Sequence, residues 1–561
     1  MTRWIFPPAV DVAEVRKLAQ QLGVARFAAE LLLRRGIASP LDAEDFLAPR
    51  LKSLRDPFLL PHMNAAVERI LAAVERCERV VLYGDYDVDG VTSLALLTRV
   101  LRAFGAEPAC FLPLRADEGY GLSDDGVTRC RSEHAPQLII AVDCGTSAVA
   151  QIAELRAQGI DVIVLDHHEC KDARPDCVAL VNPKLGDDFQ YLCSVGIVFK
   201  VAHALLKRRP VEGFDLRDCL DLVALGCVAD LVPLRAENRI FVRRGLAQLA
   251  ESKWIGLRAL VEVSGLSTPF SPGDIGFGLA PRLNAAGRLG TAQDALELLL
   301  TEDAGRARTL AMNLDVQNRE RRAVEEAVFQ EAEAQLAGCF DAARDAAIVV
   351  GARGWHTGVV GIVASRLQKR YHRPALVIGF DESGLGKGSG RSIEGLSLVA
   401  ALVECGQYLE RHGGHEMAAG LTLREEHFAA FRAAFGACAR AALTEDLLQR
   451  RLRLDAELTL GEIDYELLDQ HEALQPFGMG HPQPLFAARG VTLAGEPRVM
   501  KEKHLSLMLR QAGDEYRAVW FGAASETLPR LPWDIAFQIE RNEWQGTVSP
   551  QIHVRAVRQA E

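Results

Sequence analysis

Four short apolar runs in the first half of the chain each stop at acidic or histidine side chains. They are RVVLY (79–83), QLIIAV (137–142), DVIVL (161–165) and LVALGCVA (222–229). The first three are rich in β-branched residues and predict buried strands of a parallel sheet, whereas the fourth also suits a helix end. Sites in open α/β sheets form outside the carboxyl ends of the strands, so we expect the side chains that follow these runs to converge.

Most of the polar side chains after these runs are carboxylates. The segment GDYDVDG carries three Asp residues at alternate positions, and an extended segment would direct all three to one side. So many carboxylates in one crevice repel each other unless cations lie between them, so the pattern predicts a two-metal hydrolytic site. The candidates are Asp85, Asp87, Asp89, Asp143, Asp166, His167, His168 and Asp230.

Beyond these runs the pattern changes along the chain. Strand-like runs alternate with helical patterns between residues 65 and 260, which is typical of βαβ units. Residues 292–337 are highly charged, contain almost no Gly or Pro, and predict a long rigid helix. A second α/β region follows at 345–445, and the last hundred residues alternate in short strands as in a small β-barrel.

These changes predict five segments. We expect an N-terminal helical extension lying over the first domain, an α/β domain that carries the metal-ligand candidates, a connecting long helix, a smaller α/β domain and a small β-barrel. Their expected bounds are 1–60, 61–285, 286–340, 341–450 and 451–561.

Composition narrows the class of protein. The chain has 561 residues, of which 49% are hydrophobic and 25% charged, as in soluble multidomain proteins. The formal charge of 64 − 75 = −11 argues against a broad basic surface, so a polyanion must meet local positive charge or bound metal. The start lacks the order of a signal peptide and no apolar stretch reaches roughly 20 residues, so we expect a cytoplasmic protein without a membrane partner.

The donor types indicate the metal. Carboxylate oxygens with one or two imidazoles suit Mn²⁺ or Mg²⁺ better than a structural zinc ion, although Zn²⁺ and Co²⁺ remain possible. Asp143 arrives alone from its own strand and is the natural bridge between two ions. Any one of these Asp residues would more often cap a helix or a turn, and only the whole set favours a site.

The motifs GDYDVDG, VDCG, DHH and VAD, in this order and spacing, resemble the DHH phosphoesterases, and among them the RecJ single-stranded-DNA exonucleases. The segments PRLNAAGRLG (281–290), GSGRSIEG (388–395) and GGHEMAAG (413–420) are similar to later motifs of that family. The resemblance implies an α/β fold: a parallel-sheet DHH domain that binds metal and carries the catalysis, and a smaller DHHA1-like domain that binds substrate, joined by a long helix. An OB-fold barrel that binds nucleic acid would follow.

The resemblance also implies roles for the candidate ligands. Asp87 and Asp143 would hold one cation, with Asp85 in or beside that site. The second cation would be held by Asp89, Asp143, His167 and Asp230. Asp166 would orient ligands. His168 would contact the scissile phosphate or assist the leaving 3′-oxygen, unless its role is structural. Many family members carry a His where this chain has Tyr83.

Further residues are candidates for substrate binding. Arg115 and Tyr120 offer a phosphate clamp and a stacking ring. A Gly-containing loop presents three more side chains, and a Gly-rich phosphate cradle with a nearby His presents four. These seven are Arg282, Asn284, Arg288, Ser389, Arg391, Ser392 and His415. Surface ion pairs and ordinary turns are the alternatives. The cradle is neither a Walker loop nor a dinucleotide fingerprint, so ATP and NAD are not expected.

The resemblance implies an exonuclease that uses Mn²⁺ or Mg²⁺ to degrade single-stranded DNA from its 5′ end to 5′-mononucleotides, in repair and recombination. Asp89, Asp143 and His168 would carry the catalysis, in a monomer that works with single-stranded-DNA-binding protein and a repair helicase. A phosphodiesterase of small nucleotides or nano-RNA and a metal-free scaffold are the alternatives. The latter is disfavoured because only catalysis explains keeping mutually repulsive carboxylates together.

Overall fold

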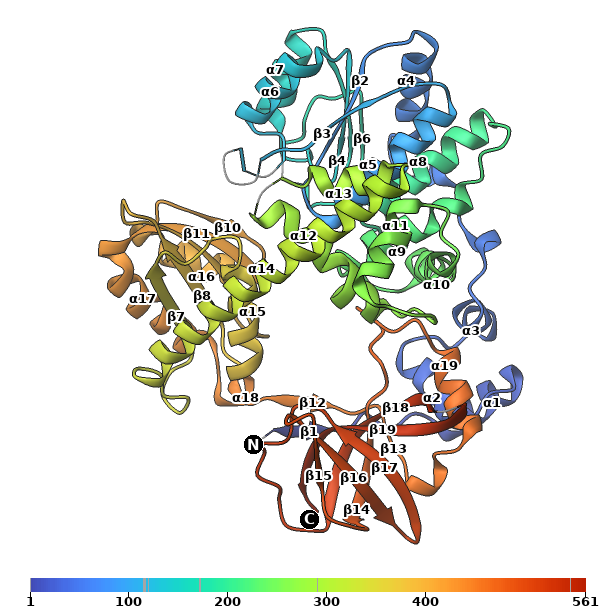
Figure 1. Ribbon diagram of the computed structural model, residues 1–561, viewed down its shortest axis with the longest axis vertical. Coiled ribbons are helices and arrows are strands. Elements are labelled where there is room, and N and C mark those ends of the chain that lie inside the picture. Colours follow the sequence, from blue (N-terminus) through green and yellow to red (C-terminus); the bar gives the residue numbers. More distant parts are fainter. Residues whose placement is uncertain are drawn as a thin grey trace. The chain divides into compact units, whose positions relative to one another are not determined.

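The computed structural model describes residues 2–114, 118–119, 121–170, 173–289, 291–544 and 546–560. The chain forms two compact units (Figure 1). The larger unit contains residues 4–280, 299–304 and 453–561, and the smaller unit contains residues 1–3, 281–298 and 305–452. Each unit has its own sheets and its own hydrophobic clusters.

A five-stranded sheet with all strands parallel forms the core of the larger unit's first half. Its order is β3-β2-β4-β5-β6. The strands are β2 (Val80–Gly84), β3 (Ala109–Phe111), β4 (Leu138–Val142), β5 (Asp161–Leu165) and β6 (Ala179–Val181). Side chains are buried on both faces of the central strands, so the runs are apolar throughout rather than alternating. The predicted parallel α/β sheet is confirmed.

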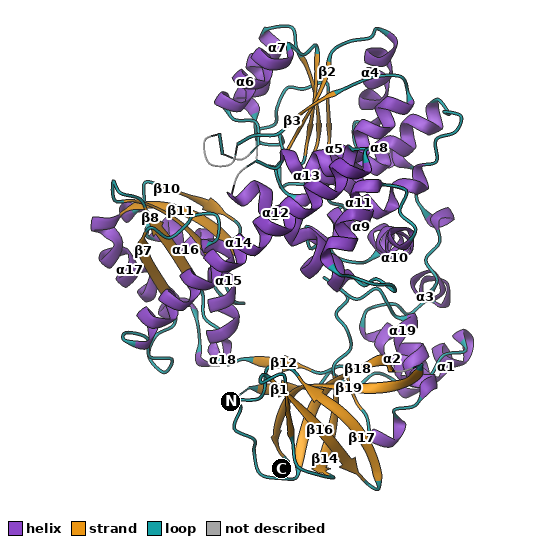
Figure 2. Ribbon diagram, viewed as in Figure 1, coloured by secondary structure: helices purple, strands orange, loops and turns teal. Residues whose placement is uncertain are grey.

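Helices cover both faces of this sheet (Figure 2). Helices α6 (Asp124–His134) and α7 (Val149–Ala157) pack on one face, where Val81, Tyr83 and Ile139 contribute to a buried cluster. The other face carries α4 (Met63–Glu75), α5 (Val88–Ala103) and α8 (Ser194–Arg208), and α5 packs on α9 (Leu220–Ala229). The fourth apolar run is therefore a helix. It is followed by α10 (Ala236–Ala250), α11 (Ile255–Ser264) and a π-helical turn (Asp274–Leu279).

The C-terminal residues form the expected β-barrel. Its strands are β13 (Ala456–Glu457), β14 (Phe486–Leu493), β15 (Arg498–Met500), β16 (His504–Gln511), β17 (Asp514–Trp520), β18 (Trp533–Trp544) and β19 (Thr547–Gln559), with α19 (Tyr465–Ala473) before β14. They pair in the order β13-β14-β18-β19-β17-β16-β15. A further pairing of β14 with β16, between Thr492 and Arg510, closes the ring. Closure leaves few unpaired edges.

The N-terminal helices belong with this barrel. Helices α1 (Val12–Leu22), α2 (Arg26–Arg34) and α3 (Pro40–Leu47) bury residues in the same cluster as the barrel interior. The rings of Phe27 and Phe486 lie 6.0 Å apart, edge to face. The sequence-based expectation placed this extension over the first domain. It was wrong for α1 and α2, because amphipathic periodicity gives the width of an apolar face and not the surface that covers it. Residues after them do contact the first domain, where the Phe46 and Arg55 carbonyls accept hydrogen bonds from Arg239 and Lys200.

The smaller unit contains a mixed sheet of order β10-β11-β9-β8-β7. Its strands are β7 (Ile348–Arg353), β8 (Ala375–Phe380), β9 (Leu385–Arg391), β10 (Arg411–Gly414) and β11 (Ala418–Arg424). One face packs against α14 (Ala304–Ala337) and α15 (Val360–Tyr371), the other against α16 (Leu398–Glu404) and α17 (Phe428–Ala442). The short helix α18 (Glu445–Leu448) follows, and β1 (Arg3–Ile5) pairs with β12 (Arg451–Arg453).

The helix expected over residues 292–337 is interrupted. Helix α13 (Gln293–Leu300) ends before α14 begins, and α14 alone has 34 residues and is about 51 Å long. The Thr301 hydroxyl accepts a hydrogen bond of 3.2 Å from the Asp303 backbone N–H. Such a local bond competes with the helical ladder, which explains the break. No helix within the described ranges is both long enough and apolar enough to cross a bilayer.

Candidate metal centre

The segment after β2 is not extended as expected, because a helix begins inside it. Asp87 is the N-cap of α5 and its Oδ1 accepts the Gly90 N–H at 3.1 Å. Asp85 precedes the cap, whereas Asp89 lies in the first helical turn and points elsewhere. A Cβ on Gly90 would lie 2.4 Å from the Asp85 carbonyl oxygen, so this turn requires glycine. One short segment thus directs Asp85 and Asp87 to one group of side chains and Asp89 to another.

Asp89 is anchored by another helix. Its two carboxylate oxygens accept the backbone N–H groups of Ser194 and Val195, at 2.7 and 2.8 Å. These groups belong to the first turn of α8, where unpaired N–H groups and the helix dipole favour a negative charge. The start of α8 therefore fixes the Asp89 side chain.

Asp143 directly follows β4 and is 2% exposed. Its φ of 61° lies in the left-handed region, which is costly for a residue with a Cβ. The Ser194 hydroxyl donates a hydrogen bond of 2.8 Å to Asp143 Oδ1. Strained backbone held by surrounding contacts is common at functional sites, so this turn serves to aim the carboxylate.

The Asp-His-His segment follows β5, and its aspartate faces inward. Asp166 Oδ1 accepts the backbone N–H groups of His167 and His168 and lies 2.7 Å from His168 Nδ1. Asp166 Oδ2 accepts the Thr146 N–H at 3.0 Å. All of these contacts are to the protein, so Asp166 orients the two histidines.

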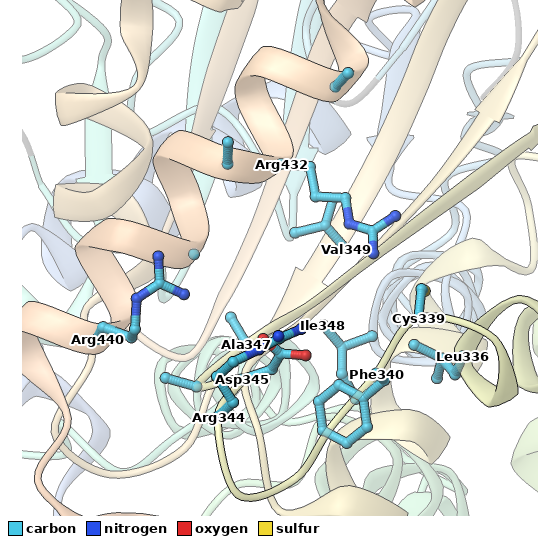
Figure 3. A pocket seen from close by; sticks show the side chains of 14 residues that line it. Leu336, Cys339, Phe340, Arg344, Asp345, Ala347, Ile348, Val349, Arg432 and Arg440 are labelled. Atoms are coloured by element: carbon cyan, nitrogen blue, oxygen red, sulfur yellow. Dashed lines mark ion pairs between the residues drawn. The ribbon is translucent and has the colours of Figure 1, made fainter.

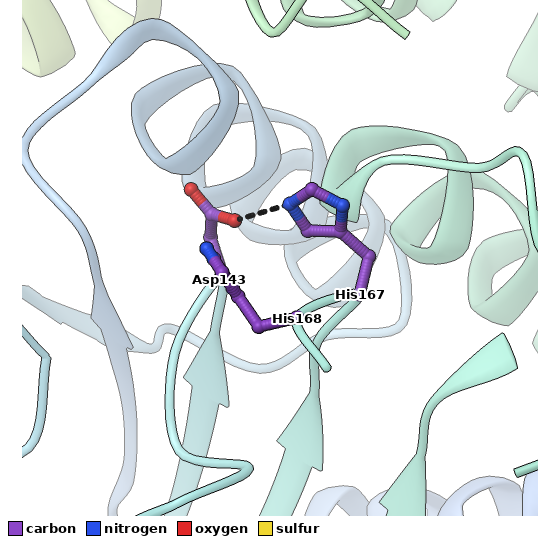
Figure 4. Close-up of side chains that lie close together, drawn as sticks. All are labelled: Asp143, His167 and His168. Atoms are coloured by element: carbon purple, nitrogen blue, oxygen red, sulfur yellow. Dashed lines mark ion pairs between the residues drawn. The ribbon is translucent and has the colours of Figure 1, made fainter. Parts of the chain in front are cut away.

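His167 joins the carboxylates that come from separate elements. Its Nε2 lies 3.4 Å from Asp143 Oδ1, 3.7 Å from Asp230 Oδ2 and 4.0 Å from Asp89 Oδ2. Figure 4 shows the His167 ring directed at Asp143, with the contact drawn as a dashed line. Asp230 is the C-cap of α9, which explains how a helix end brings this carboxylate to the cluster.

Three sets of side chains bring their ligand atoms within 4.8 Å of one another. They are Asp85 with Asp87 and Asp143, Asp89 with His167 and Asp230, and Asp143 with His167 and His168. The first two sets match the two groups of ligands expected from the sequence, and Asp143 and His167 lie where the sets meet. The structure thus brings together all six expected ligands.

The electrostatics of the cluster require compensating positive charge. Burial, and then the charges of Asp89, Asp87 and Asp85, raise the pKa of Asp143 well above its ordinary value. Burial and a neighbouring Asp likewise raise the pKa of Asp89 to about 7 and that of Asp230 to about 8. Hard oxygen donors that cannot all ionise alone fit divalent cations such as Mn²⁺ or Mg²⁺.

The two histidines differ in charge. Burial, with His168 nearby, lowers the pKa of His167 to about 4, so its ring is neutral and can bind a cation. Burial opposes protonation of His168, but its hydrogen bond to Asp166 raises the pKa to about 9. In the metal-free protein His168 therefore favours its protonated form, which can donate to an anion.

Tyr83 lies outside the cluster. Its hydroxyl donates a hydrogen bond of 3.0 Å to the Gly121 carbonyl, and its ring contacts Phe111 at 4.8 Å between centroids. The side chain is fully buried on the sheet face that carries α6 and α7. The position where many DHH phosphoesterases have a His thus contributes to the core in this chain.

Sequence reasoning missed the residues that support the ligands. Ser194 holds Asp143, and Asn182 donates to the Thr146 hydroxyl at 3.0 Å and to the His168 carbonyl at 2.9 Å. Asn182 follows β6, a short strand of the sheet that had not been predicted. A polar residue after a further short apolar run, ALV, was the available signal.

The substrate candidates fall into separate groups. Arg115 and Tyr120 lie outside the described residues. The expected loop at 281–290 is largely helix α12 (Ala280–Leu289), which carries Asn284. On it Arg282 pairs with Asp315 at 2.9 Å, and Arg288 donates to the Gly358 carbonyl at 3.1 Å.

The Gly-rich cradle is strand β9 and not a loop. A Cβ at Gly386, Gly388 or Gly390 would lie 2.4–2.6 Å from the side chains of Phe380, Ile378 and Leu376. These glycines make room for bulky cross-strand neighbours, which local sequence cannot show.

Ser389 and Arg391 alternate with those glycines and contact each other, with Nη1 to Oγ at 3.1 Å. A Cβ on Gly361, in the first turn of α15, would lie 3.0 Å from Ser389 Oγ. Burial lowers the pKa of Arg391. His415 lies in the turn between β10 and β11, and Ser392 is buried with its hydroxyl donating to the Leu396 carbonyl at 2.7 Å.

Three family models match the chain. They are the DHH family N-terminal domain over residues 79–227, the DHHA1 domain over 345–441 and the RecJ OB domain over 454–556. Curated relatives match over most of the chain. The single-stranded-DNA-specific exonuclease RecJ of Bacillus subtilis is 36% identical over 97% of this chain and 69% of its own length. RecJ of Escherichia coli is 36% identical over 88% of this chain and 89% of its own length.

Solved structures agree with these matches. RecJ from Thermus thermophilus in complex with Mn²⁺ superimposes with a TM-score of 0.86 at 31% identity, covering 100% of this chain and 80% of that one. The same protein with Mg²⁺ gives a TM-score of 0.81 at 30% identity, covering 100% of this chain and 79% of that one.

Proposed function

The chain belongs to the RecJ family of single-stranded-DNA-specific exonucleases, and we propose on this basis that it is a two-metal exonuclease degrading single-stranded DNA from the 5′ end to 5′-mononucleotides. The observation that carries the proposal is the pair of ligand sets that meet at Asp143 and His167. Six candidate ligands from four separate segments converge there. Burial and mutual repulsion raise the pKa values of Asp89, Asp143 and Asp230, and bound cations would offset that repulsion.

Each set would hold one divalent cation, Mn²⁺ or Mg²⁺. Asp85, Asp87 and Asp143 would hold the first, and Asp89, His167, Asp230 and Asp143 the second. When bound, two such cations activate water and neutralise the charge that develops during phosphodiester hydrolysis. The neutral state of His167 suits a ligand, because its Nε2 lone pair is available.

The chain's own residues hold this arrangement in place. Ser194 fixes Asp143, the start of α8 fixes Asp89, and Asp166 fixes the ring of His168 through Nδ1. Protonated His168 would donate from Nε2 to a non-bridging phosphate oxygen, or to the 3′-oxygen as that group leaves. The Asp166 contact supports this role because it favours the protonated form of His168.

The smaller unit would recognise the 5′ end. Ser389 and Arg391 alternate along β9 near the first turn of α15, and helix N-termini bind phosphate. Burial lowers the pKa of Arg391, so an anion beside it would stabilise its charged form. Ser392, whose hydroxyl is engaged with the backbone, would support the fold and not the substrate.

The barrel would hold the strand beyond the site. Phe521 is 51% exposed and its ring lies 5.1 Å from His553 and 5.2 Å from His504, whereas Phe537 is core. Exposed rings of this kind stack on bases. We further propose a cytoplasmic monomer that acts in DNA repair and recombination beside single-stranded-DNA-binding protein and a helicase.

One assay separates these proposals from the alternatives. Purified protein is incubated with Mn²⁺ or Mg²⁺ and either dinucleotides or long single strands labelled at the 5′ or the 3′ end. Early release of labelled mononucleotide from the 5′ end alone supports the proposed direction. Cleavage of dinucleotides only would indicate a small-nucleotide phosphodiesterase, and binding without cleavage at any metal concentration would indicate a scaffold.

A further inference from the structure

A groove of about 300 Å³ lies beside strand β7 in the smaller unit, and none of the residues that line it was assigned a role above. Figure 3 shows Arg432 and Arg440 on α17 at one side, and Leu336 and Phe340 at the opposite side. Residues 344–349 lie between the two sides. The groove therefore follows the chain into β7.

Strand β7 is the last strand of its sheet, so one of its edges has no neighbouring strand. The Ile348 N–H donates to the Pro374 carbonyl at 2.8 Å, on the side of β8. Because N–H and C=O groups of alternate residues face opposite sides in a parallel ladder, those of Val349 face the groove. Further along, the Gly351 carbonyl accepts a hydrogen bond of 3.3 Å from the Gln335 side chain, which closes that end.

Helices border this edge on both faces of the sheet. The Val349 side chain packs in the cluster that includes Phe431 of α17, whereas Ile348 packs in the cluster that includes Leu336 of α14. Both helices also line the groove, so their surfaces extend past β7. A strand added about 4.8 Å from β7 would lie between these two layers. The groove therefore lies where a sixth strand would join the sheet beside β7.

The charges in the groove favour an acidic occupant. Arg432 and Arg440 are exposed, and within the described ranges no carboxylate pairs with either. Arg344 also lines the groove. It pairs at 3.6 Å with Asp345, the one carboxylate among the residues that line the groove. Three guanidiniums against one carboxylate make a local positive charge on a chain whose net charge is −11.

The spacing of the arginines matches an extended strand. Arg432 and Arg440 are eight residues apart on α17, or about 12 Å along its axis. Four residues of extended chain advance about 13 Å, and side chains at i, i+2 and i+4 share one face. The lining residues of α17 between the arginines are small, Ala433 and Gly436, which leaves room for a backbone to approach.

We propose that the groove binds an extended acidic segment of a partner protein as a sixth strand on β7. Acidic side chains at positions i and i+4 meet Arg432 and Arg440, while apolar side chains at i+1 and i+3 face Leu336 and Phe340. A nucleic acid strand is a poorer match, because phosphates only accept hydrogen bonds and cannot pair with both the N–H and the C=O of Val349.

The test uses the full-length protein and a fluorescein-labelled peptide, SDVALDS in one-letter code, followed by fluorescence anisotropy. The matched peptide SNVALNS removes only the two charges. We expect Arg432→Glu and Arg440→Glu each to weaken binding of SDVALDS at least tenfold. Lys369→Glu, which makes the same change of charge at an exposed position of α15, should leave binding unchanged. Ala433→Phe fills the groove and should abolish binding, whereas Ala437→Phe, an exposed alanine on α17 outside the groove, should not.

Hydrogen exchange checks the strand pairing, and nuclease assays check that the site is separate. The peptide should slow exchange of the Val349 amide, whereas the Ile348 amide, already bonded to Pro374, should change little. All four variants of α17 should cleave single-stranded DNA at the wild-type rate. The proposal is overturned if SDVALDS and SNVALNS bind equally, if no binding is seen up to about 1 mM protein, or if a single-stranded oligonucleotide displaces the peptide from the groove. None of these results depends on the direction or metal dependence of the nuclease.

Discussion

The Ser194 hydroxyl donates a hydrogen bond of 2.8 Å to Asp143 Oδ1, so the first turn of α8 holds the carboxylate at which the two ligand sets meet. The backbone N–H of the same serine holds Asp89 at 2.7 Å. One residue therefore sets the separation of two ligands from different elements. Such supporting contacts govern metal affinity and activity.

Ser194→Ala should lower activity about 10- to 100-fold, as loss of a supporting contact does at other metal sites. The backbone bond to Asp89 survives this substitution, so the fold and the ligand count remain. The rate should recover partly when Mn²⁺ is raised, because the lost contact acts through the ligand. Wild-type kcat and KM at low Mn²⁺ would refute this role, and Ser194→Thr, which keeps the hydroxyl, is the matched control.

Metal affinity should rise with pH. The folded, metal-free pKa values of Asp89 and Asp230, about 7 and about 8, lie above the ordinary carboxyl value. Their protonated forms stabilise the metal-free fold below about pH 4, and this contribution is lost as pH rises through about 7 to 8. Cations must displace these protons, so calorimetry in buffers of different ionisation enthalpy should show proton release on Mn²⁺ binding at neutral pH. Binding without proton release at pH 7 would contradict the raised pKa values.

Arg391→Ala should weaken discrimination between 5′-phosphorylated and 5′-hydroxyl strands more than it weakens hydrolysis. The guanidinium contacts Ser389 and lies near the first turn of α15, where a terminal phosphate would gain a charge-assisted bond. The measurement is the ratio of kcat/KM for the two substrates. Arg424→Ala, which removes an exposed arginine on neighbouring β11, is the control. An unchanged ratio in Arg391→Ala would leave β9 a purely structural role.

The N-terminal helices and the barrel should unfold together. Phe27 is buried against Phe486, so Phe27→Ala should cost about 3–5 kcal/mol and lower the melting temperature of the barrel strands as well. Phe521→Ala, at an exposed ring, should change stability by less than about 0.5 kcal/mol. Hydrogen exchange resolves the two regions, and independent melting of α2 and β14 would contradict a shared core.

Elements whose signal is local were predictable from the sequence. The three central strands are buried on both faces, so each is a continuous apolar run. Asp143 and the Asp-His-His segment directly follow two of these runs, so their position at the carboxyl ends of the strands could be predicted as well. The barrel followed from its alternating pattern, as β16 illustrates with Leu505, Leu507 and Leu509 buried.

Features that depend on distant neighbours were not predictable. Whether Asp85, Asp87 and Asp89 share a side depends on where α5 begins, and Asp87 begins it as a cap. The glycines of β9 are required by the bulky side chains of neighbouring β8, and no local sequence pattern shows which residues are neighbours. From the sequence Ser194 is an ordinary first residue of a helix, and its role depends on the packing of α8 against Asp143.

Asp143→Asn tests the account most directly, because both ligand sets depend on this carboxylate. Calorimetric titration of the metal-free protein with Mn²⁺ should show two ions per wild-type chain and at most one in the variant, with hydrolysis lost. Without metal the variant should be at least as stable as wild type, since removing a buried charge relieves repulsion. Asp221→Asn, at a buried carboxylate nine residues before Asp230 on α9, should keep both ions. Two ions and wild-type cleavage in Asp143→Asn would contradict the two-metal centre.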